Sequence, residues 1–324
     1  MTLDDIKTAG VVGGGTMGFG IGLNFALGGF RTIIRDVDDE KIVLTMENVR
    51  SALDLFLEEG IVTGEQADAA IERVSVTTDL EELATQSDFV TEAIVERLAD
   101  KQTLFKSLDE MCPSHTIIVS NTSGFVLSDI GEGVKRQDKL GLTHYFAPPH
   151  IVPGVEVAKG PGTTDETYEI IYNLMKLVKR VPIRILRELP GYLLNRIQGA
   201  MGREASRLWA EGVASAEDIE LGIQSTFGFR MPHEGPFLHF DLAGIWRWPQ
   251  EAGNKKRSEA PPISKEAQAK LKARRGEGKP WFLDPDPNKF NEAVLRRDRE
   301  YVRRLKELYS DDGLVWNTSP LHAV

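Results

Sequence analysis

The feature that most constrains this 324-residue chain is a glycine-rich run, Gly13 to Gly18, that directly follows a short apolar segment. The spacing of Gly13, Gly15 and Gly18 matches the pattern G-x-G-x-x-G. In that pattern the first glycine permits a tight turn, the second lets a pyrophosphate approach the backbone, and the third lets a helix pack on a strand. The N-terminus of that helix offers N–H groups and a partial positive charge to the phosphates. We therefore predict a dinucleotide site on this loop, with Thr16 and Met17 among its residues.

An acidic residue, Asp36, ends the next β-like run, 23 residues after Gly13. At that position a carboxylate accepts hydrogen bonds from the adenosine ribose and repels a 2′-phosphate. The adjacent Arg35 should point to the opposite side of the strand. The sequence thus predicts NAD, in preference to NADP, as the cofactor. The competing interpretation is a glycine-rich turn that serves packing alone.

The first half of the chain alternates short β-like runs with helical patterns, which indicates a mostly parallel sheet covered by helices. The predicted strands cover residues 8–12, 31–36, 74–77, 89–93, 116–120, 140–145 and 182–186. The predicted helices cover residues 38–59, 64–73, 98–111 and 164–178. Thr63 and Thr164 are suited to cap two of these helices, because their side chains can accept the first free backbone N–H groups.

After residue 186 the pattern becomes helical, with predicted helices at 192–212, from the Ser215 cap to about 226, and at 288–309. The stretch 250–262 is polar, contains prolines and is typical of a loop. We therefore predict an α/β fold, with a Rossmann-type domain at residues 1–187 followed by a smaller all-helical domain at residues 188–324.

Composition excludes several classes of protein. The formal net charge of −10 argues against nucleic acid or an anionic membrane as the main partner. The run Lys270–Arg275 is best interpreted as a solvated helix end. A single cysteine, Cys112, excludes an internal disulfide and suits a reducing compartment. With neither a secretory signal nor a membrane-length apolar segment in view, we predict a cytoplasmic protein.

A histidine and a glutamate form the second informative pair in the sequence. His144 ends an apolar-alternating stretch, and Glu156 follows twelve residues later between two valines. A carboxylate can hold a histidine ring and favour its protonated form, which makes the histidine a usable proton acceptor near neutral pH. The alternative is a hydrogen-bonded core histidine. The six histidines show no metal-ligand spacing, so we predict no metal site.

Six motifs in order resemble the 3-hydroxyacyl-CoA dehydrogenase family over nearly the whole chain. They are residues 11–21 (VVGGGTMGFGI), 88–96 (DFVTEAIVE), 120–123 (SNTS), 141–146 (GLTHYF), Glu156 and 190–196 (PGYLLNR). The resemblance implies oxidation of a C3 alcohol with hydride transfer to NAD.

The same resemblance implies a role for individual residues. His144 would be the general base, with Glu156 orienting its ring and balancing its charge. Ser123 and Asn195 would hydrogen-bond the reacting oxygen and its surroundings. Glu96, Lys101 and Asn121 would belong to the cofactor site, the first two along the nicotinamide half. The resemblance also implies a homodimer formed through the helical domain. Alternatively, Ser123 caps the following turn, Asn195 ties helix carbonyls, and Glu96 and Lys101 form only a surface pair.

Two departures from the family pattern leave the substrate open. Ala147 stands where many family members have an asparagine that supports the catalytic cluster. The helix segment 54–59 is acidic, whereas CoA-using relatives tend to carry lysines there, so an acidic surface would repel the CoA phosphates.

Other features resemble relatives that oxidise free small acids or aromatic alcohols, namely the carnitine and gulonate dehydrogenases, the lambda-crystallin group and pyridine-carboxylate dehydrogenases. Arg230, in the shared run Gly228-Phe229-Arg230, could then pair with a substrate carboxylate. A structural ion pair is the alternative for Arg230. The leading hypothesis is an NAD-dependent dehydrogenase of a small 3-hydroxy acid or acyl derivative. A true L-3-hydroxyacyl-CoA dehydrogenase and a non-catalytic, crystallin-like NAD-binding protein are the alternatives.

Overall fold

The computed structural model describes residues 2–244, 269, 286–310 and 313–314. The chain forms two compact units, Met1–Gly202 and Arg203–Val324, which divide within helix α8 (Leu194–Ala210). The predicted domain boundary at residues 187/188 stays a prediction. Both the basic run Lys270–Arg275 and the predicted loop at 250–262 lie outside the described residues.

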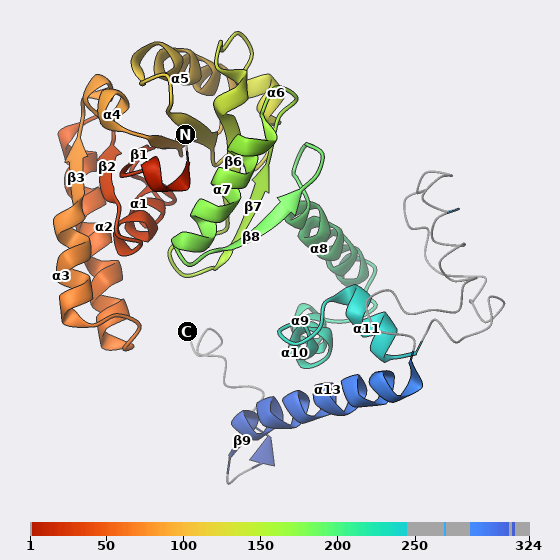
Figure 1. Ribbon diagram of the computed structural model, residues 1–324. Coiled ribbons are helices and arrows are strands. Elements are labelled where there is room, and N and C mark those ends of the chain that lie inside the picture. Colours follow the sequence, from red (N-terminus) through yellow and green to blue (C-terminus); the bar gives the residue numbers. More distant parts are fainter. Residues whose placement is uncertain (1, 245–268, 270–285, 311–312, 315–324) are drawn as a thin grey trace. The chain divides into compact units, whose positions relative to one another are not determined.

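The first unit is built on an eight-stranded sheet with the order β3-β2-β1-β4-β5-β6-β7-β8 (Figure 1). Its strands are β1 (Thr8–Val12), β2 (Arg31–Arg35), β3 (Val74–Thr77), β4 (Phe89–Glu92), β5 (Ile117–Ser120), β6 (Leu140–Tyr145), β7 (Gly154–Ala158) and β8 (Val181–Ile185). Neighbouring strands from β3 to β6 are parallel, whereas β7 runs antiparallel to β6 and β8 runs parallel to β7. The carboxyl ends of β1, β2, β4, β5 and β6 therefore meet at one edge of the sheet, where ligands bind in such folds.

Helices cover both faces of this sheet. They are α1 (Gly18–Leu27), α2 (Asp39–Glu58), α3 (Gly64–Arg73), α4 (Leu80–Gln86), α5 (Leu98–Met111), α6 (Leu127–Ile130) and α7 (Asp165–Leu177), with 3-10 turns at Leu3–Asp5 and Gln137–Lys139. One buried apolar cluster joins the strands to α1, α2, α3 and α7, and another joins them to α4, α5 and α6. In β5, Ile117 and Val119 belong to the first cluster and Ile118 to the second. This alternation is expected of a strand that is buried on both faces.

The predicted fold class is confirmed, and several elements keep their predicted bounds. Strands β1, β3 and β6 and helices α3 and α5 begin and end where the sequence patterns place them. Both predicted caps are present, since Thr63 accepts the Gln66 N–H and Thr164 accepts the Thr167 N–H. Helices α4 and α6 were not predicted, because seven and four residues are too few to display a helical period.

The second unit is largely helical among its described residues, as predicted. After α8 it contains α9 (Ala216–Ser225), α10 (Phe227–Arg230), α11 (Pro236–Leu242) and α13 (Pro287–Leu308). The Ser215 side chain accepts the Asp218 N–H and caps α9, as its position in the sequence indicates. Two short antiparallel strands, β9 (Tyr309–Ser310) and β10 (Gly313–Leu314), also occur in this unit, and the all-helical prediction did not include them.

Asp88 ties the amino-terminal ends of three strands of the sheet together. Its carboxylate accepts the Lys7 and Thr8 N–H groups at 2.8 and 2.9 Å, and His115 Nε2 lies 2.9 Å away. Partial burial alone would raise the pKa of Asp88, but these hydrogen bonds together lower it below its ordinary value.

We expect Asp88→Asn to lower the free energy of unfolding by about 1–2 kcal/mol at neutral pH, because the neutral amide is a weaker acceptor and carries no charge. Because the pKa is lowered in the folded state, the contribution of Asp88 is complete above the ordinary aspartate pKa and is lost as the pH falls below it. Urea unfolding between neutral pH and about pH 3 should therefore show the two proteins converging in acid. Glu110→Gln, at an exposed site on α5, is the control and should change stability by less than about 0.5 kcal/mol. A constant difference across this pH range would contradict the assignment.

Candidate active site

The glycine-rich loop connects β1 to α1 at the carboxyl edge of the sheet. Gly13 has a positive φ of 99°, and a Cβ there would lie 2.6 Å from the Ala93 carbonyl oxygen. A Cβ on Gly18 would lie 1.6 Å from the Gly13 carbonyl oxygen, whereas a Cβ on Gly15 would meet nothing within 4 Å. The first and third glycines are therefore required by the fold, and the second leaves open space on the loop. Such a surface fits the approach of a pyrophosphate.

Asp36 follows β2 and lies beside this loop. Its Oδ2 accepts the Gly14 N–H at 2.8 Å, and its Oδ1 accepts the Val37 N–H at 2.7 Å. The carboxylate is half-buried, and each oxygen keeps a second lone pair. Arg35, its neighbour, donates from Nε to the Thr78 carbonyl. The contact of Asp36 with an adenosine ribose stays a prediction.

His144 and Glu156 face each other across the antiparallel pair β6–β7. They are directly opposite in the register, so their side chains lie on the same face of the sheet. His144 Nδ1 is 2.7 Å from Glu156 Oε2, and both side chains are buried. Since Nδ1 is engaged by the carboxylate, the ring presents Nε2 as its second functional nitrogen.

The other oxygen of Glu156 holds the beginning of α8. Glu156 Oε1 accepts the Leu193 and Leu194 N–H groups at 2.9 and 2.8 Å. A helix N-terminus carries free N–H donors and a partial positive charge, and both stabilise a carboxylate. This second function of Glu156 was not predicted, because it joins segments 37 residues apart in the sequence.

A cavity of about 410 Å³ opens between the glycine-rich loop and His144. Its volume suits part of a small organic ligand. The lining includes seven of the predicted site residues and five neighbours: Met17, Glu96, Lys101, Asn121, Ser123, His144 and Asn195, with Ala93, Ile94, Tyr145, Phe146 and Ala147. Residues predicted to bind the cofactor and residues predicted to act in catalysis thus line the same cavity.

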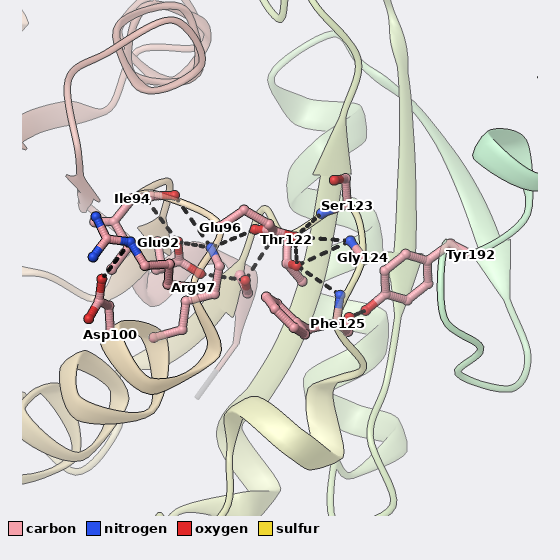
Figure 2. Close-up of polar contacts among 12 residues, drawn as sticks. Glu92, Ile94, Glu96, Arg97, Asp100, Thr122, Ser123, Gly124, Phe125 and Tyr192 are labelled. Atoms are coloured by element: carbon pink, nitrogen blue, oxygen red, sulfur yellow. Dashed lines mark hydrogen bonds and ion pairs between the residues drawn. The ribbon is translucent and has the colours of Figure 1, made fainter.

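Glu96 organises the turn after β5, as Figure 2 shows. Its Oε1 accepts the Thr122 hydroxyl at 2.5 Å and the Ser123 and Gly124 N–H groups at 3.2 and 3.0 Å. Thr122 also accepts the Phe125 N–H. The side chain that caps this turn is therefore Thr122, and not Ser123 as the alternative interpretation predicts. Burial alone would raise the pKa of Glu96, but the Thr122 hydrogen bond and the Lys101 charge lower it below its usual value.

Lys101 is a buried part of the site, which corrects the alternative of a surface pair. Its side chain is 1% exposed, and Nζ lies 2.6 Å from Glu92 Oε1, 3.1 Å from Glu96 Oε2 and 3.5 Å from the Ile94 carbonyl. Glu92 is not among the site residues that the sequence predicts. The signal available was an acidic residue at the end of an otherwise apolar strand, where a buried charge requires a partner.

Two asparagines that line the cavity form hydrogen bonds with nearby backbone groups. Asn121 Oδ1 accepts the Tyr145 N–H at 2.9 Å, which fixes the end of β6 next to His144. Asn195 Nδ2 donates to the Ser123 carbonyl at 3.4 Å. The Ser123 side chain is exposed and lines the cavity. The catalytic and cofactor roles of these residues stay predictions.

Arg230 belongs to the second unit. Its Nη1 lies 3.4 Å from His239 Nε2, and His239 Nδ1 lies 2.6 Å from Glu234 Oε1. The contact of Arg230 with a substrate carboxylate stays a prediction.

A larger cavity, of about 980 Å³, lies in the first unit between the ends of α1 and α2, helix α3 and residues 150–151 and 178–180. Leu55 and Phe56 give it an apolar wall, and Glu59 and Glu65 add carboxylates. Arg73 and Arg180 also line it, but both guanidinium groups donate to backbone carbonyls. The mixture of an apolar wall with charged groups suits an organic ligand of amphipathic character.

The fold and the site define a dinucleotide-dependent oxidoreductase, and comparison with known proteins identifies the family. Residues 8–189 match the NAD-binding domain of 3-hydroxyacyl-CoA dehydrogenase, and residues 191–281 match its C-terminal domain. The chain therefore belongs to the 3-hydroxyacyl-CoA dehydrogenase family, as the motifs predicted, and is an NAD-dependent oxidoreductase.

Individual relatives agree with this assignment. The chain is 31% identical over 245 residues to the human mitochondrial hydroxyacyl-coenzyme A dehydrogenase, covering 74% of this chain and 77% of that protein. It resembles the structure of 3-hydroxybutyryl-CoA dehydrogenase from Escherichia coli K12 with a TM-score of 0.66 and 31% identity, covering 74% of this chain but only 49% of that one. A 5-formyl-3-hydroxy-2-methylpyridine-4-carboxylic acid 5-dehydrogenase is 25% identical with a TM-score of 0.72, covering 93% of this chain and 99% of that one.

None of the helices in the described ranges has the length and apolar character needed to cross a membrane. In the same part of the chain, no three His, Cys, Asp or Glu side chains are grouped so that they could hold a metal ion.

A matched pair of substitutions tests the glycine-rich loop. We expect Gly15→Ala to leave the unfolding midpoint nearly unchanged, because its Cβ would enter open space, yet to weaken NAD binding at least about tenfold by crowding the pyrophosphate. Gly18→Ala should instead destabilise the fold by more than about 2 kcal/mol, because its Cβ would overlap the Gly13 carbonyl. Thermal unfolding and NAD titration of both variants measure the contrast. Equal NAD affinity in Gly15→Ala and wild type would show that the cofactor does not approach this loop.

Proposed function

We propose that this chain oxidises the hydroxyl group of a small 3-hydroxy acid, or of an acyl derivative, to a ketone. The glycine-rich loop and Asp36 would hold NAD, which when bound would supply the oxidant that takes the hydride from the carbinol carbon. The observation that carries the proposal is the 2.7 Å contact between His144 Nδ1 and Glu156 Oε2, which leaves Nε2 as the ring's second nitrogen in a residue that lines the same cavity as Lys101 and Asn121. The hydroxyl proton passes to His144 Nε2 as the C–H electron pair leaves.

Glu156 fixes the ring of His144 and balances the positive charge that His144 gains. Both oxygens of this carboxylate are engaged, one by the ring and the other by two N–H groups of α8. Its position is therefore set before any substrate arrives, which reduces the reorganisation that the proton transfer requires.

Ser123 and Asn195 orient the substrate oxygen within this cavity. Both line the same cavity as His144, and the Asn195 amide approaches the Ser123 carbonyl. A hydroxyl and an amide can each donate to the oxygen that becomes the ketone. Ala147 also lines the cavity and has only a methyl group. Ser123 and Asn195 therefore supply polar contacts to which a polar side chain at position 147 could otherwise contribute.

The surface of α2 favours a free acid over a CoA thioester. Asp54, Glu58 and Glu59 are exposed, and the last turn of α2 contains no basic residue. Glu59 also lines the 980 Å³ cavity. The phosphates of CoA would be repelled by these carboxylates, although salt screens part of the effect. Against this, the human mitochondrial and Escherichia coli relatives are named for CoA substrates, which keeps a CoA ester as the second candidate.

The homodimer, the cytoplasmic location and the placing of Arg230 on a substrate carboxylate are parts of the same hypothesis that rest on the family resemblance and on composition. They stay predictions.

The general-base role is tested by His144→Gln. We expect kcat to fall by about 10²–10⁴-fold, because glutamine cannot accept the proton. Affinity for NAD should stay within about twofold of wild type, because the proposed role of His144 is toward the substrate. A twofold change in Kd corresponds to well under 1 kcal/mol. NADH formation and NAD titration measure the two effects. Undiminished turnover in His144→Gln would contradict the role of His144 as the general base.

The substrate class is tested with a panel of free 3-hydroxy acids and the matching CoA thioesters. We expect kcat/KM for the best free acid to exceed that of its thioester at least about tenfold at low ionic strength, because α2 repels phosphates. Glu59→Lys should raise kcat/KM for thioesters while leaving free acids nearly unchanged. Glu110→Lys, which adds the same charge on α5, is the matched control. Preferential turnover of thioesters by the wild type would instead support the second candidate.

A further inference from the structure

Glu92, the last residue of β4, is a buried carboxylate that has no role in the proposed reaction. Its side chain is 0% exposed and lies behind Lys101, which forms the cavity wall. Glu92 Oε1 accepts Lys101 Nζ at 2.6 Å and the Ile94 N–H at 2.8 Å, and Oε2 accepts the Ser120 hydroxyl at 2.5 Å. A carboxylate buried to this extent is stable only when it is paired and hydrogen-bonded, and both conditions are met.

Lys101 is shared between Glu92 and Glu96. Figure 2 shows these two carboxylates and the turn next to Glu96. Glu92 is the closer and the fully buried partner, whereas Glu96 is 40% exposed and faces the cavity. Two carboxylates and one ammonium give this cluster a formal charge of −1. If Lys101 had Glu96 as its only partner, the two charges would cancel and the cavity wall would be neutral.

This excess charge matters because the two forms of the cofactor differ in charge at the nicotinamide ring. The oxidised ring carries one positive charge, which disappears when the ring accepts a hydride. A negative wall stabilises the oxidised ring relative to the reduced one, and in a partly buried site the effect is stronger than in water.

We propose that Glu92 is a positioning residue that acts through Lys101, holding it in place and leaving the charge of Glu96 uncompensated, so that the site favours NAD+ over NADH. This inference rests on the proposed function, in which Glu96 and Lys101 lie along the nicotinamide half of the cofactor. The role differs from simple support of the fold, because it predicts a change in the ratio of two affinities.

The test uses Glu92→Gln in the full-length protein and the dissociation constants of NAD+ and NADH. Glutamine can keep the contacts with Lys101, Ile94 and Ser120 but removes the charge. We expect the ratio Kd(NAD+)/Kd(NADH) to rise about tenfold. Lys101→Met should shift the ratio in the opposite direction, and the double variant Glu92→Gln/Lys101→Met, which restores a charge of −1, should return it to within about threefold of wild type.

Two controls separate charge from structure. Ser120→Ala removes a hydrogen bond to Glu92 but no charge, and Asp109→Asn neutralises a carboxylate that pairs with Arg136 away from the cavity. Both should leave the ratio unchanged even if thermal stability falls. A ratio that stays at the wild-type value in Glu92→Gln, or that moves the same way in Glu92→Gln and Lys101→Met, would overturn the role of Glu92. Failure of the wild type to bind either form of the cofactor would contradict the proposed function itself.

Discussion

The reversal of chain direction between β6 and β7 is the constraint on which the site depends. In the parallel part of the sheet, each strand returns to the same edge after a helix, and residues close in sequence cannot pair across it. Between β6 and β7 the chain turns back within a few residues, so His144 and Glu156 lie opposite each other in the register. A proton acceptor and its counter-charge are therefore positioned by backbone hydrogen bonds, before any side-chain preference contributes.

Glu156 then extends this arrangement into the next part of the chain. Through its second oxygen it holds the first N–H groups of α8, the helix that leads toward the second unit. Loss of the carboxylate would leave two backbone donors and the histidine ring without their partner, and an unpaired buried polar group costs about 1–3 kcal/mol. One side chain thus contacts both the His144 ring and the start of α8, so in the proposed function a substitution of Glu156 would lower stability as well as turnover.

The sequence predicts those parts of the structure that depend on local pattern. The glycine-rich loop, the bounds of α3 and α5 and the strand that carries His144 all follow from spacing and periodicity. The Glu92 cluster does not, because it depends on the parallel register of β4 and β5, which places Glu92 beside Ser120 across 28 residues. The sequence predicts Lys101 near the cofactor, but its burial against Glu92 joins α5 to the end of β4 and has no local sequence pattern. The capping of the turn by Thr122 also escapes local pattern, because the Thr122 hydroxyl is held by Glu96, which is 26 residues away in the sequence.

Two groups of carboxylates next to the residues that line the cavity pair with different cations. Glu156 pairs with a histidine, His144, whereas Glu92 and Glu96 share a lysine, Lys101. In the proposed reaction the nicotinamide ring loses one positive charge as His144 gains one. The positive charge therefore moves from the neighbourhood of one carboxylate cluster to that of the other, and the net charge of the cavity is unchanged. Carboxylates at both positions would lower the electrostatic cost of the two charge states of this proposed reaction, and the role proposed for Glu92 concerns how tightly the oxidised and reduced cofactors bind.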